Sequence, residues 1–178
     1  VDNEYSTAIE VALGAAMQNV VVSSEADAKR AINYLKQNNQ GRATFLPLSS
    51  IQGRALQENG LESCRGFVGI ASELVKCEDK YRGIVENLLA RTVIVSDLDA
   101  AIAMSQRYRS RFKIVTLDGQ VMNPGGSMTG GSENKDAGTL SRADELEKLA
   151  QPGDMIITVG AGDIYRAGEM LLKRGDAQ

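Results

Sequence analysis

The sequence predicts an α/β fold in which one strand–helix–strand unit occurs twice. Residues 20–48 read VVVSSEADAKRAINYLKQNNQGRATFLPL, and residues 93–119 read VIVSDLDAAIAMSQRYRSRFKIVTLDG. Each segment opens with three β-branched apolar residues, passes through serine and acidic residues into a helical stretch, and closes with a second apolar stretch. The units begin 73 residues apart, at Val20 and Val93. Internal repetition is the interpretation we favour, and chance similarity between two common α/β patterns is the alternative.

Both units carry signals for the start of a helix. Ser24 and Ser96 are the predicted N-caps, and Asp27 and Asp99 follow three residues later, where an acidic side chain interacts favourably with the helix dipole. Apolar or small residues then recur at helical spacing and predict one buried face on each helix. These residues are Ala28, Ala31, Ile32 and Leu35 in the first unit, and Leu98, Ala101, Ile102 and Ser105 in the second.

A further helix is expected before each unit. The apolar stripes that predict them are Ile9, Ala12, Leu13, Ala16 and Met17, and then Tyr81, Ile84, Val85, Leu88 and Leu89. Residues 49–70 contain glycine without a clear period and are expected to form an irregular connection between two subdomains. Towards the end of the chain, the pattern predicts a solvated loop at 132–139 and a short capped helix at 141–150. A turn, a strand and a last helix are expected after that.

Composition limits the classes of function. The chain has 178 residues, 43% of them apolar and 24% charged, which is typical of a soluble globular protein with one ordinary domain or one domain and an appendage. No apolar run is long enough to span a membrane and no secretory leader is recognisable, so we expect no membrane partner. Cys64 and Cys77 are expected to be reduced thiols in a cytosolic protein.

The chain contains no histidine, which excludes Ser–His and Cys–His nucleophiles within it and leaves the two cysteines without a partner for zinc. No constellation of carboxylates or lysines suggests another reaction. We therefore expect no enzymatic activity, no metal, no cofactor and no small-molecule substrate. The net charge of −3 argues against broad coating of nucleic acid but leaves room for a local basic patch.

Residues 117–135, LDGQVMNPGGSMTGGSENK, form a glycine-rich loop. A phosphate-binding P-loop would need a lysine after its last glycine, whereas Ser132 and Glu133 follow Gly130 and Gly131 here. The spacing of a dinucleotide-binding fingerprint is also missing. Two interpretations remain. The segment is either a mobile loop, or a place where glycines let another backbone approach without a Cβ in the way.

Residues 107–113, RYRSRFK, place the four cations Arg107, Arg109, Arg111 and Lys113 around two aromatic residues. Such a pattern can bind phosphates and stack on bases, as single-strand binders do. The alternative is structural. Arg107 and Arg109 would then interact with the C-terminus of a helix while Phe112 enters the core. The two interpretations are compatible.

Three blocks together resemble the hinge domain of bacterial structural maintenance of chromosomes (SMC) proteins. They begin EYSTAIEVALGAAMQNVVVSSEADAKRAINYL, YRGIVENLLARTVIVSDLDAAIAM and FKIVTLDGQVMNPGGSMTGGS, and the resemblance spans residues 1–149. It implies two mixed α/β subdomains, at about 1–65 and 66–149, that form a ring-shaped homodimer. It also implies a dimer contact through the glycine loop, at Gly125, Gly126, Ser127, Gly130 and Gly131. Close backbone approach is thus favoured for that loop.

The resemblance implies a mechanical function. A hinge of this family joins two coiled-coil arms of a chromosome-organising ATPase, so that DNA can be enclosed, and the ATP-binding heads are separate domains. Weak DNA contact is expected, with Arg107, Arg109, Arg111 and Lys113 as candidates, and the location implied is cytoplasmic and nucleoid-associated. Hinges of this family also have a glycine-containing strand ahead of the position that corresponds to Val1.

Residues 150–178 do not resemble a hinge. Their stretch PGDMIITVGAGDIY is similar to the C-terminal end of UDP-N-acetylmuramate–alanine ligases. Two alternatives to the hinge function follow. One is a fragment of an ATP-dependent ligase that uses the turn from Gly160 to Asp163, and the other is a single-strand nucleic-acid-binding module. Because no lysine-bearing phosphate loop is present, we expect this tail to be catalytically silent.

Overall fold

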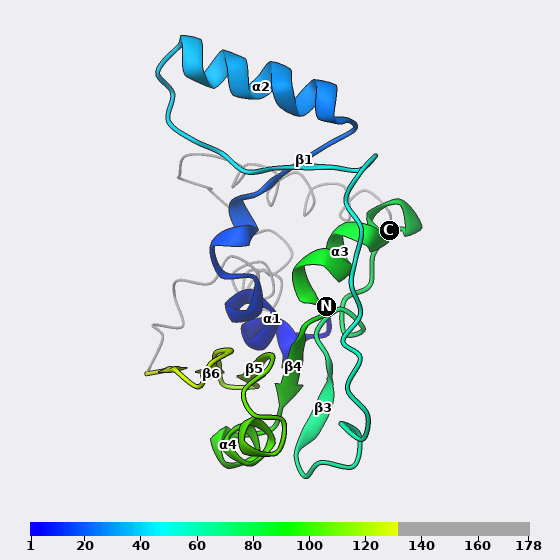
Figure 1. Ribbon diagram of the computed structural model, residues 1–178, viewed down its shortest axis with the longest axis vertical. Coiled ribbons are helices and arrows are strands. Elements are labelled where there is room, and N and C mark those ends of the chain that lie inside the picture. The colour runs from blue at the N-terminus through cyan, green and yellow to red at the C-terminus, as the bar shows by residue number, and fades with distance from the viewer. Residues whose placement is uncertain (132–178) are drawn as a thin grey trace, which may run out of the picture. The chain divides into compact units, whose positions relative to one another are not determined.

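The computed structural model describes residues 1–131, which lie in one compact unit, Val1–Ser132, and contain two sheets (Figure 1). The first sheet pairs β1 (Val20–Val22) with β2 (Phe45–Pro47). The second has the order β3-β4-β5-β6-β7, with β3 at Phe67–Ile70, β4 at Thr92–Val95, β5 at Lys113–Thr116, β6 at Val121–Met122 and β7 at Met128–Thr129. The loop, helix and tail that the sequence predicts beyond residue 131 lie outside the described residues.

Four α-helices accompany the sheets in the described part of the chain. They are α1 (Ser6–Leu13), α2 (Glu25–Gln37), α3 (Arg82–Leu89) and α4 (Leu98–Arg107). Short 3-10 helices precede α1 and α3, at Asn3–Tyr5 (η1) and Asp79–Tyr81 (η3), and another follows α1 at Gly14–Gln18 (η2). None of the helices described is long and apolar enough to cross a lipid bilayer.

The predicted repeat is confirmed at the level of topology. The β1–α2–β2 and β4–α4–β5 units each consist of two parallel strands joined by a helix, with Val20 opposite Phe45 and Val93 opposite Ile114. Equivalent hydrogen bonds close the two ladders: the Leu48 N–H donates to the Val22 carbonyl at 2.9 Å, and the Leu117 N–H donates to the Val95 carbonyl at 3.0 Å. The two acceptors are 73 residues apart, which is the spacing of the sequence repeat.

The first predicted N-cap is confirmed and the second is wrong by one residue. The Ser24 Oγ accepts a hydrogen bond from the Asp27 N–H at 3.3 Å and donates one to the Asp27 carboxylate at 2.8 Å. At α4 the cap is Asp97, whose carboxylate accepts from the Ala100 N–H at 2.9 Å, while the Ser96 hydroxyl donates to Asp97. Asp97 has the extended backbone of a cap residue, and it stands 73 positions after Ser24.

The helix predicted from Ile9 to Met17 ends early. Gly14 has φ +50° and ψ −128°, which no α-helix contains, and α1 therefore ends at Leu13. Ala16 and Met17 lie in the 3-10 turn that follows. The stripe predicted before the second unit is confirmed at two of its positions, because Ile84 and Leu89 are buried on α3.

Three strands were not predicted. β3 lies within the segment expected to be irregular and pairs antiparallel with β4. β6 and β7 form a hairpin inside the glycine loop, with Val121 opposite Thr129 and Met122 opposite Met128. The strands of this hairpin have only two residues each, which is too short for the period of two to be visible in the sequence.

Strand β4 of the five-stranded sheet is buried on both faces. Val93 and Val95 point into a cluster with Met104 of α4 and Phe112, whereas Ile94 points into a second cluster with Ile9 of α1. This division follows from the alternation of side chains along a strand. Every residue of β4 is buried as a result. The segment α1, although it belongs to the first half of the sequence, thus packs in the core of the second sheet.

The β1–α2–β2 unit is much more exposed. Val20 and Val21 are 43% and 42% exposed, and Ile32, which the sequence predicts on the buried face of α2, is 50% exposed. Ala28 is the buried residue of α2. In the second unit β3 covers the outer edge of β4, but no described strand covers the equivalent edge of β1. The exposure of Ile32 follows from this small, half-covered sheet.

The connection between the two sheets lies along α3. An alanine Cβ at Gly53 would lie 2.1 Å from the Cβ of Glu86, and one at Gly83 would lie 3.1 Å from the Ile51 carbonyl oxygen. The Asn87 side chain donates to the Gln52 carbonyl at 3.0 Å. These close contacts fix the segment that leaves β2 against the helix that precedes β4.

Candidate functional site

The glycine loop forms a tight hairpin. The Gly126 N–H donates to the Asn123 carbonyl at 2.9 Å, and the Asn123 N–H donates to the Ser127 carbonyl at 2.8 Å. Pro124 and Gly125 are the central residues of the turn, and Gly125 has φ +87°. A turn with proline second and a positive φ third requires glycine at the third position. The sequence Asn-Pro-Gly-Gly is therefore the signal that would have predicted this hairpin.

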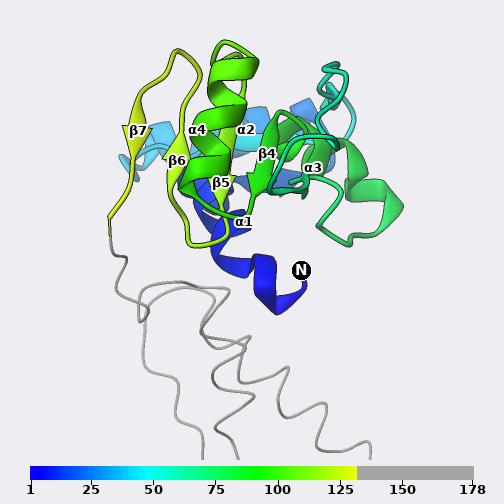
Figure 2. The same cartoon turned by 90° about the horizontal axis from the view of Figure 1, so that it is seen from below.

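Residues 107–113, called the cationic loop below, lie beside this hairpin in space (Figure 2). α4 and β5 are joined by a turn in which Arg109 and Ser110 have φ +54° and +50°. The Gly125 N–H donates to the Ser110 carbonyl at 2.9 Å, and the Ser110 hydroxyl lies 2.8 Å from that of Ser105. The turn that carries Arg109 is thus joined to Gly125 of the predicted dimer contact through Ser110, fifteen residues earlier in the chain. No local sequence signal indicates this contact.

Gly130 and Gly131 are held by a side chain. The carboxamide of Gln120 accepts from the Gly131 N–H at 2.9 Å and donates to the Gly131 carbonyl at 3.1 Å. A Cβ at Gly130 would lie 2.1 Å from the Gln120 Oε1. At Gly130, therefore, the missing Cβ makes room for the Gln120 side chain of the same chain.

The remaining candidates for a dimer contact face solvent. Gly125, Ser127 and Gly131 are exposed, and the space around a Cβ at Gly125 or Gly131 is open to 4 Å. β7 is the last strand of the sheet, and its Met128 is 53% exposed. This edge combines free space, a strand side that no other described strand covers, and an exposed apolar side chain.

The three arginines of the cationic loop lie at the surface. Arg107, the last residue of α4, has its guanidinium 3.4 Å from the Cys64 Sγ and 5.5 Å from the Tyr108 ring centroid. Arg111 forms an exposed ion pair with Glu58 at 3.4 Å. Arg109 stands at the tip of the turn. These positions leave the three charges able to reach a ligand in solvent.

The aromatic residues of this loop serve the core. Phe112 is 2% exposed, as the structural alternative predicts, so stacking of this ring on a base is excluded in this fold. Tyr108 packs against Phe112 with ring centroids 5.5 Å apart, and its hydroxyl donates to the Asn59 carbonyl at 2.8 Å. Burial, followed by the hydrogen bond with Cys64, raises the pKa of Tyr108.

Lys113 differs from the three arginines. Its ammonium donates to the carbonyls of Val11 at 3.2 Å and Ala12 at 3.0 Å, which are acceptors at the C-terminus of α1. Burial lowers the pKa of Lys113. Because its donors already have partners inside the protein, Lys113 is poorly placed to bind phosphate.

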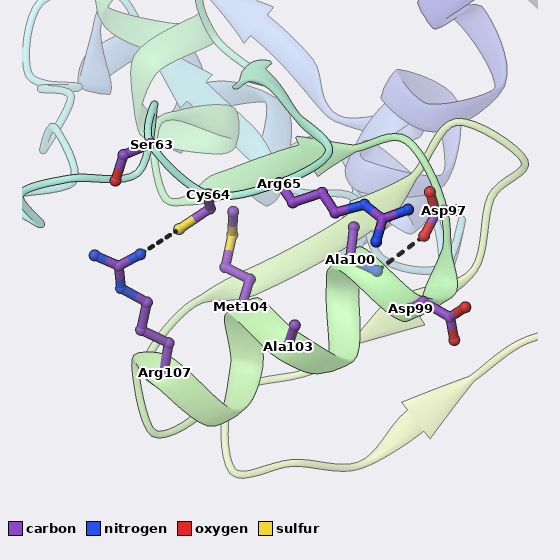
Figure 3. Close-up of a pocket in the computed structure, with 9 residues that line it drawn as sticks. All are labelled: Ser63, Cys64, Arg65, Asp97, Asp99, Ala100, Ala103, Met104 and Arg107. Carbon is purple, nitrogen blue, oxygen red and sulfur yellow. Dashed lines mark hydrogen bonds between the residues drawn. The ribbon is translucent and has the colours of Figure 1, made fainter.

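A surface hollow of about 460 Å³ lies between α4 and the segment that precedes β3 (Figure 3). Two arginines and two aspartates line it, so its charges balance: Arg65, Arg107, Asp97 and Asp99. The Ser96 hydroxyl and the Ala100 N–H hold the pKa of Asp97 below its ordinary value of 3.8, and the charge of Arg65 acts in the same direction. Among the residues described, no group of cysteine and acidic side chains is arranged to hold a metal ion.

Comparison with known proteins places these features in a family. Residues 1–105 match the model of the flexible hinge domain of SMC proteins. The chromosome partition protein Smc of Bacillus subtilis is 47% identical over 154 residues, which cover 84% of this chain and 13% of that protein. This chain therefore spans a small part of that relative.

Two solved structures share the fold. The crystal structure of an asymmetric dimer of the Geobacillus stearothermophilus SMC hinge domain is 42% identical, with a TM-score of 0.74, and the match covers 99% of this chain and 68% of that one. The Pyrococcus furiosus SMC hinge domain is 30% identical with a TM-score of 0.61, covering 90% and 74%. The mixed α/β fold predicted from the repeat is the fold of these hinges.

Proposed function

This chain belongs to the family of SMC flexible hinge domains, and we propose from that premise that it is the homodimerisation hinge of a chromosome partition protein. Hinge domains of this family are dimerisation domains and not enzymes, and this chain, as a member of the family, is not an enzyme. In the parent protein the hinge would join two coiled-coil arms whose distant heads bind ATP, so that two chains together enclose DNA. The location proposed is the cytoplasm, at the nucleoid.

The domain boundaries are part of this proposal. We assign residues 1–149 to the hinge, with a division near residue 65, because β1 and β2 precede that point and β3 to β7 follow it. Residues 150–178 are proposed to be an appended segment and fall outside the described residues. The ligase alternative rests on those residues alone, and the relatives found are SMC proteins.

The dimer proposal depends on two strand edges that the described part of the chain leaves uncovered, one in each half. In the second half, no strand of residues 1–131 pairs with the outer edge of β7, which lies beside Gly125, Gly126, Ser127, Gly130 and Gly131. In the first half, no described strand pairs with the outer edge of β1, which carries the exposed residues Val20 and Val21. A two-fold axis allows the first half of each chain to contact the second half of its partner. Both contacts then form at once and close a ring.

The test is a glutamate at the glycine loop. Gly131 has φ +147° and open space around its Cβ position, so Gly131→Glu adds a charge to the proposed contact without a clash inside the chain. Gly14→Glu is the matched control, because Gly14 also has a positive φ and open surroundings but lies away from the loop. Light scattering after size exclusion should show a dimer for the parent and the control, and a monomer for Gly131→Glu. A monomeric parent at micromolar concentration would refute the proposal.

We also propose weak DNA contact through Arg107, Arg109 and Arg111, supported by their position at the surface beside the glycine hairpin. Lys113, the fourth candidate, is expected to contribute less because its ammonium already donates hydrogen bonds to two carbonyls of α1. The contact is expected to be electrostatic and to weaken steeply with salt, because it would depend on counterion release. Because Phe112 is buried and Tyr108 packs against it, neither ring of this loop is free to stack on bases, and no preference for single strands is expected.

Fluorescence anisotropy with labelled oligonucleotides tests this second proposal. Replacement of all three arginines by alanine should remove binding at low salt. The control variant removes three cations from α2, by Lys29→Ala, Arg30→Ala and Lys36→Ala. It changes the net charge by the same amount as the triple arginine variant and should leave binding intact. Equal loss in both variants would show that binding follows net charge and not this loop.

A further inference from the structure

Gln120 takes the place of a strand residue at the end of the β6–β7 ladder. The register places Val121 opposite Thr129 and Met122 opposite Met128, so the next pair along the hairpin is Gln120 with Gly130. There the backbone pairing stops. The Gln120 side chain continues it by bonding both the N–H and the carbonyl of Gly131, at 2.9 and 3.1 Å. The same Nε2 also lies 3.5 Å from the Asp118 carbonyl.

The glycine at 130 is what makes this arrangement possible. A Cβ there would lie 2.1 Å from the Gln120 Oε1 and 3.2 Å from its Cδ, and would displace the carboxamide. Gly131 in turn has φ +147°, a conformation that residues other than glycine rarely adopt. Without the side-chain bonds, two consecutive glycines would have large conformational freedom, and fixing them on association would cost entropy.

We propose that Gln120 is a positioning residue for self-association: it holds Gly130 and Gly131 in the one conformation that a second copy of this chain contacts. This inference rests on the proposed dimer function and adds to it the residue that prepares the contact surface. Gln120 itself binds the inner side of Gly131, while the Cβ side of Gly131 is open to 4 Å. Its effect on association is therefore indirect, through the order of the loop.

Gln120→Met tests this role in the full chain. Methionine keeps the length and volume of the side chain but cannot form either hydrogen bond. Sedimentation equilibrium should show dimerisation weakened roughly tenfold, since the two glycines would then have to be ordered on association. Gln106→Met is the control, because Gln106 is an exposed glutamine of α4 whose side chain makes no hydrogen bond in the described structure. It should dimerise like the parent.

Amide hydrogen exchange at a concentration that favours the monomer provides the second measurement. In Gln120→Met the Gly131 amide should exchange faster, while the amides of Val121 and Thr129, which face each other across the ladder, keep their rates. A faster Gly131 exchange with an unchanged dimerisation constant would overturn the positioning role and leave the dimer proposal standing. A parent chain that is monomeric throughout would overturn both. Unchanged exchange at Gly131 would show that the carboxamide does not order the loop.

Discussion

At the scale of single residues, glycines with similar backbone angles serve different purposes in this chain. Gly66 and Gly41 have φ +76° and +77°. A Cβ at Gly41 would meet open space, whereas a Cβ at Gly66 would lie 2.5 Å from the Ser96 Oγ and 2.6 Å from the Ala100 Cβ. Gly66 also accepts a hydrogen bond from the Ser96 N–H at 2.8 Å. Gly66 thus allows β3 to approach the start of α4.

We predict that Gly66→Ala and Gly41→Ala differ in their effect on the free energy of unfolding. Both impose the cost of a left-handed alanine, about 1 kcal/mol. Gly66→Ala adds overpacking against α4 and should lose about 3 kcal/mol in total. Urea denaturation of the two variants measures the difference. Equal losses would show that the backbone angle, and not the contact with α4, determines the need for glycine at position 66.

Asp97 gives stability a specific dependence on pH. Its folded-state pKa is lowered, chiefly by the Ser96 hydroxyl and the Ala100 N–H. The stabilisation from its charge is therefore fully present above the ordinary value of 3.8 and is lost as the pH falls through the lowered folded value. Asp97→Asn should lower the melting temperature at pH 7, because asparagine can cap α4 but carries no charge.

The melting temperatures of parent and Asp97→Asn should converge as the pH falls through the lowered folded-state pKa of Asp97. Asp99→Asn is a useful control, since Asp99 lies in the same first turn but does not cap the helix. A difference between parent and Asp97→Asn that persists in strong acid would show that the charge is not its origin.

At the scale of elements, the two repeated units differ in how completely they are covered. β4 has β3 on one side and β5 on the other and is buried throughout, whereas β1 pairs with β2 and has two residues more than 40% exposed. The amides of β1 and β2 should therefore exchange with solvent much faster than those of β4 and β5, by roughly two orders of magnitude or more. Hydrogen exchange followed by mass spectrometry of peptides from each unit measures this.

Association gives the same experiment a second use. If β1 contacts a partner chain, protection of β1 should increase with protein concentration while protection of β4 stays constant. Protection of β1 equal to that of β4 in dilute protein would contradict the difference in cover between the units.

Prediction from sequence succeeded where the pattern is local and long enough to repeat. The two strand–helix–strand units and the Ser24 cap follow from spacing, and the burial of Phe112 is the outcome given by the structural interpretation of residues 107–113. A constant spacing of 73 would also have given Asp97 as the second cap. The bonds of Gln120 to Gly131, and of Ser110 to Gly125, join residues whose approach depends on the completed fold. No local pattern of residues encodes such contacts.

At the scale of the whole molecule, the proposed arrangement of two chains can be tested by mixing variants. If the first half of each chain contacts the second half of its partner, Val21→Lys and Gly131→Glu should each prevent self-association. A mixture of the two should form heterodimers, because one of the two contacts is then intact on both sides. Native mass spectrometry distinguishes the species. If Val21→Lys alone dimerises normally, the contact does not involve β1.

The bonds of Lys113 to the end of α1 also determine how the domain responds to a pull. A force applied at Val1 reaches α1 first, and α1 is fastened to β5 by the Lys113 ammonium and by Ile9 in the core. Asp2 is joined to Lys76 by an ion pair at 3.2 Å. Because a close-packed interior transmits strain, the load passes from α1 into the five-stranded sheet. The elements η2, β1, α2 and β2 follow α1 in the chain and therefore lie beyond the point where α1 is bound to β5. The β1–α2–β2 unit, which is the less covered of the two described repeat units, is thereby shielded from tension that enters at Val1.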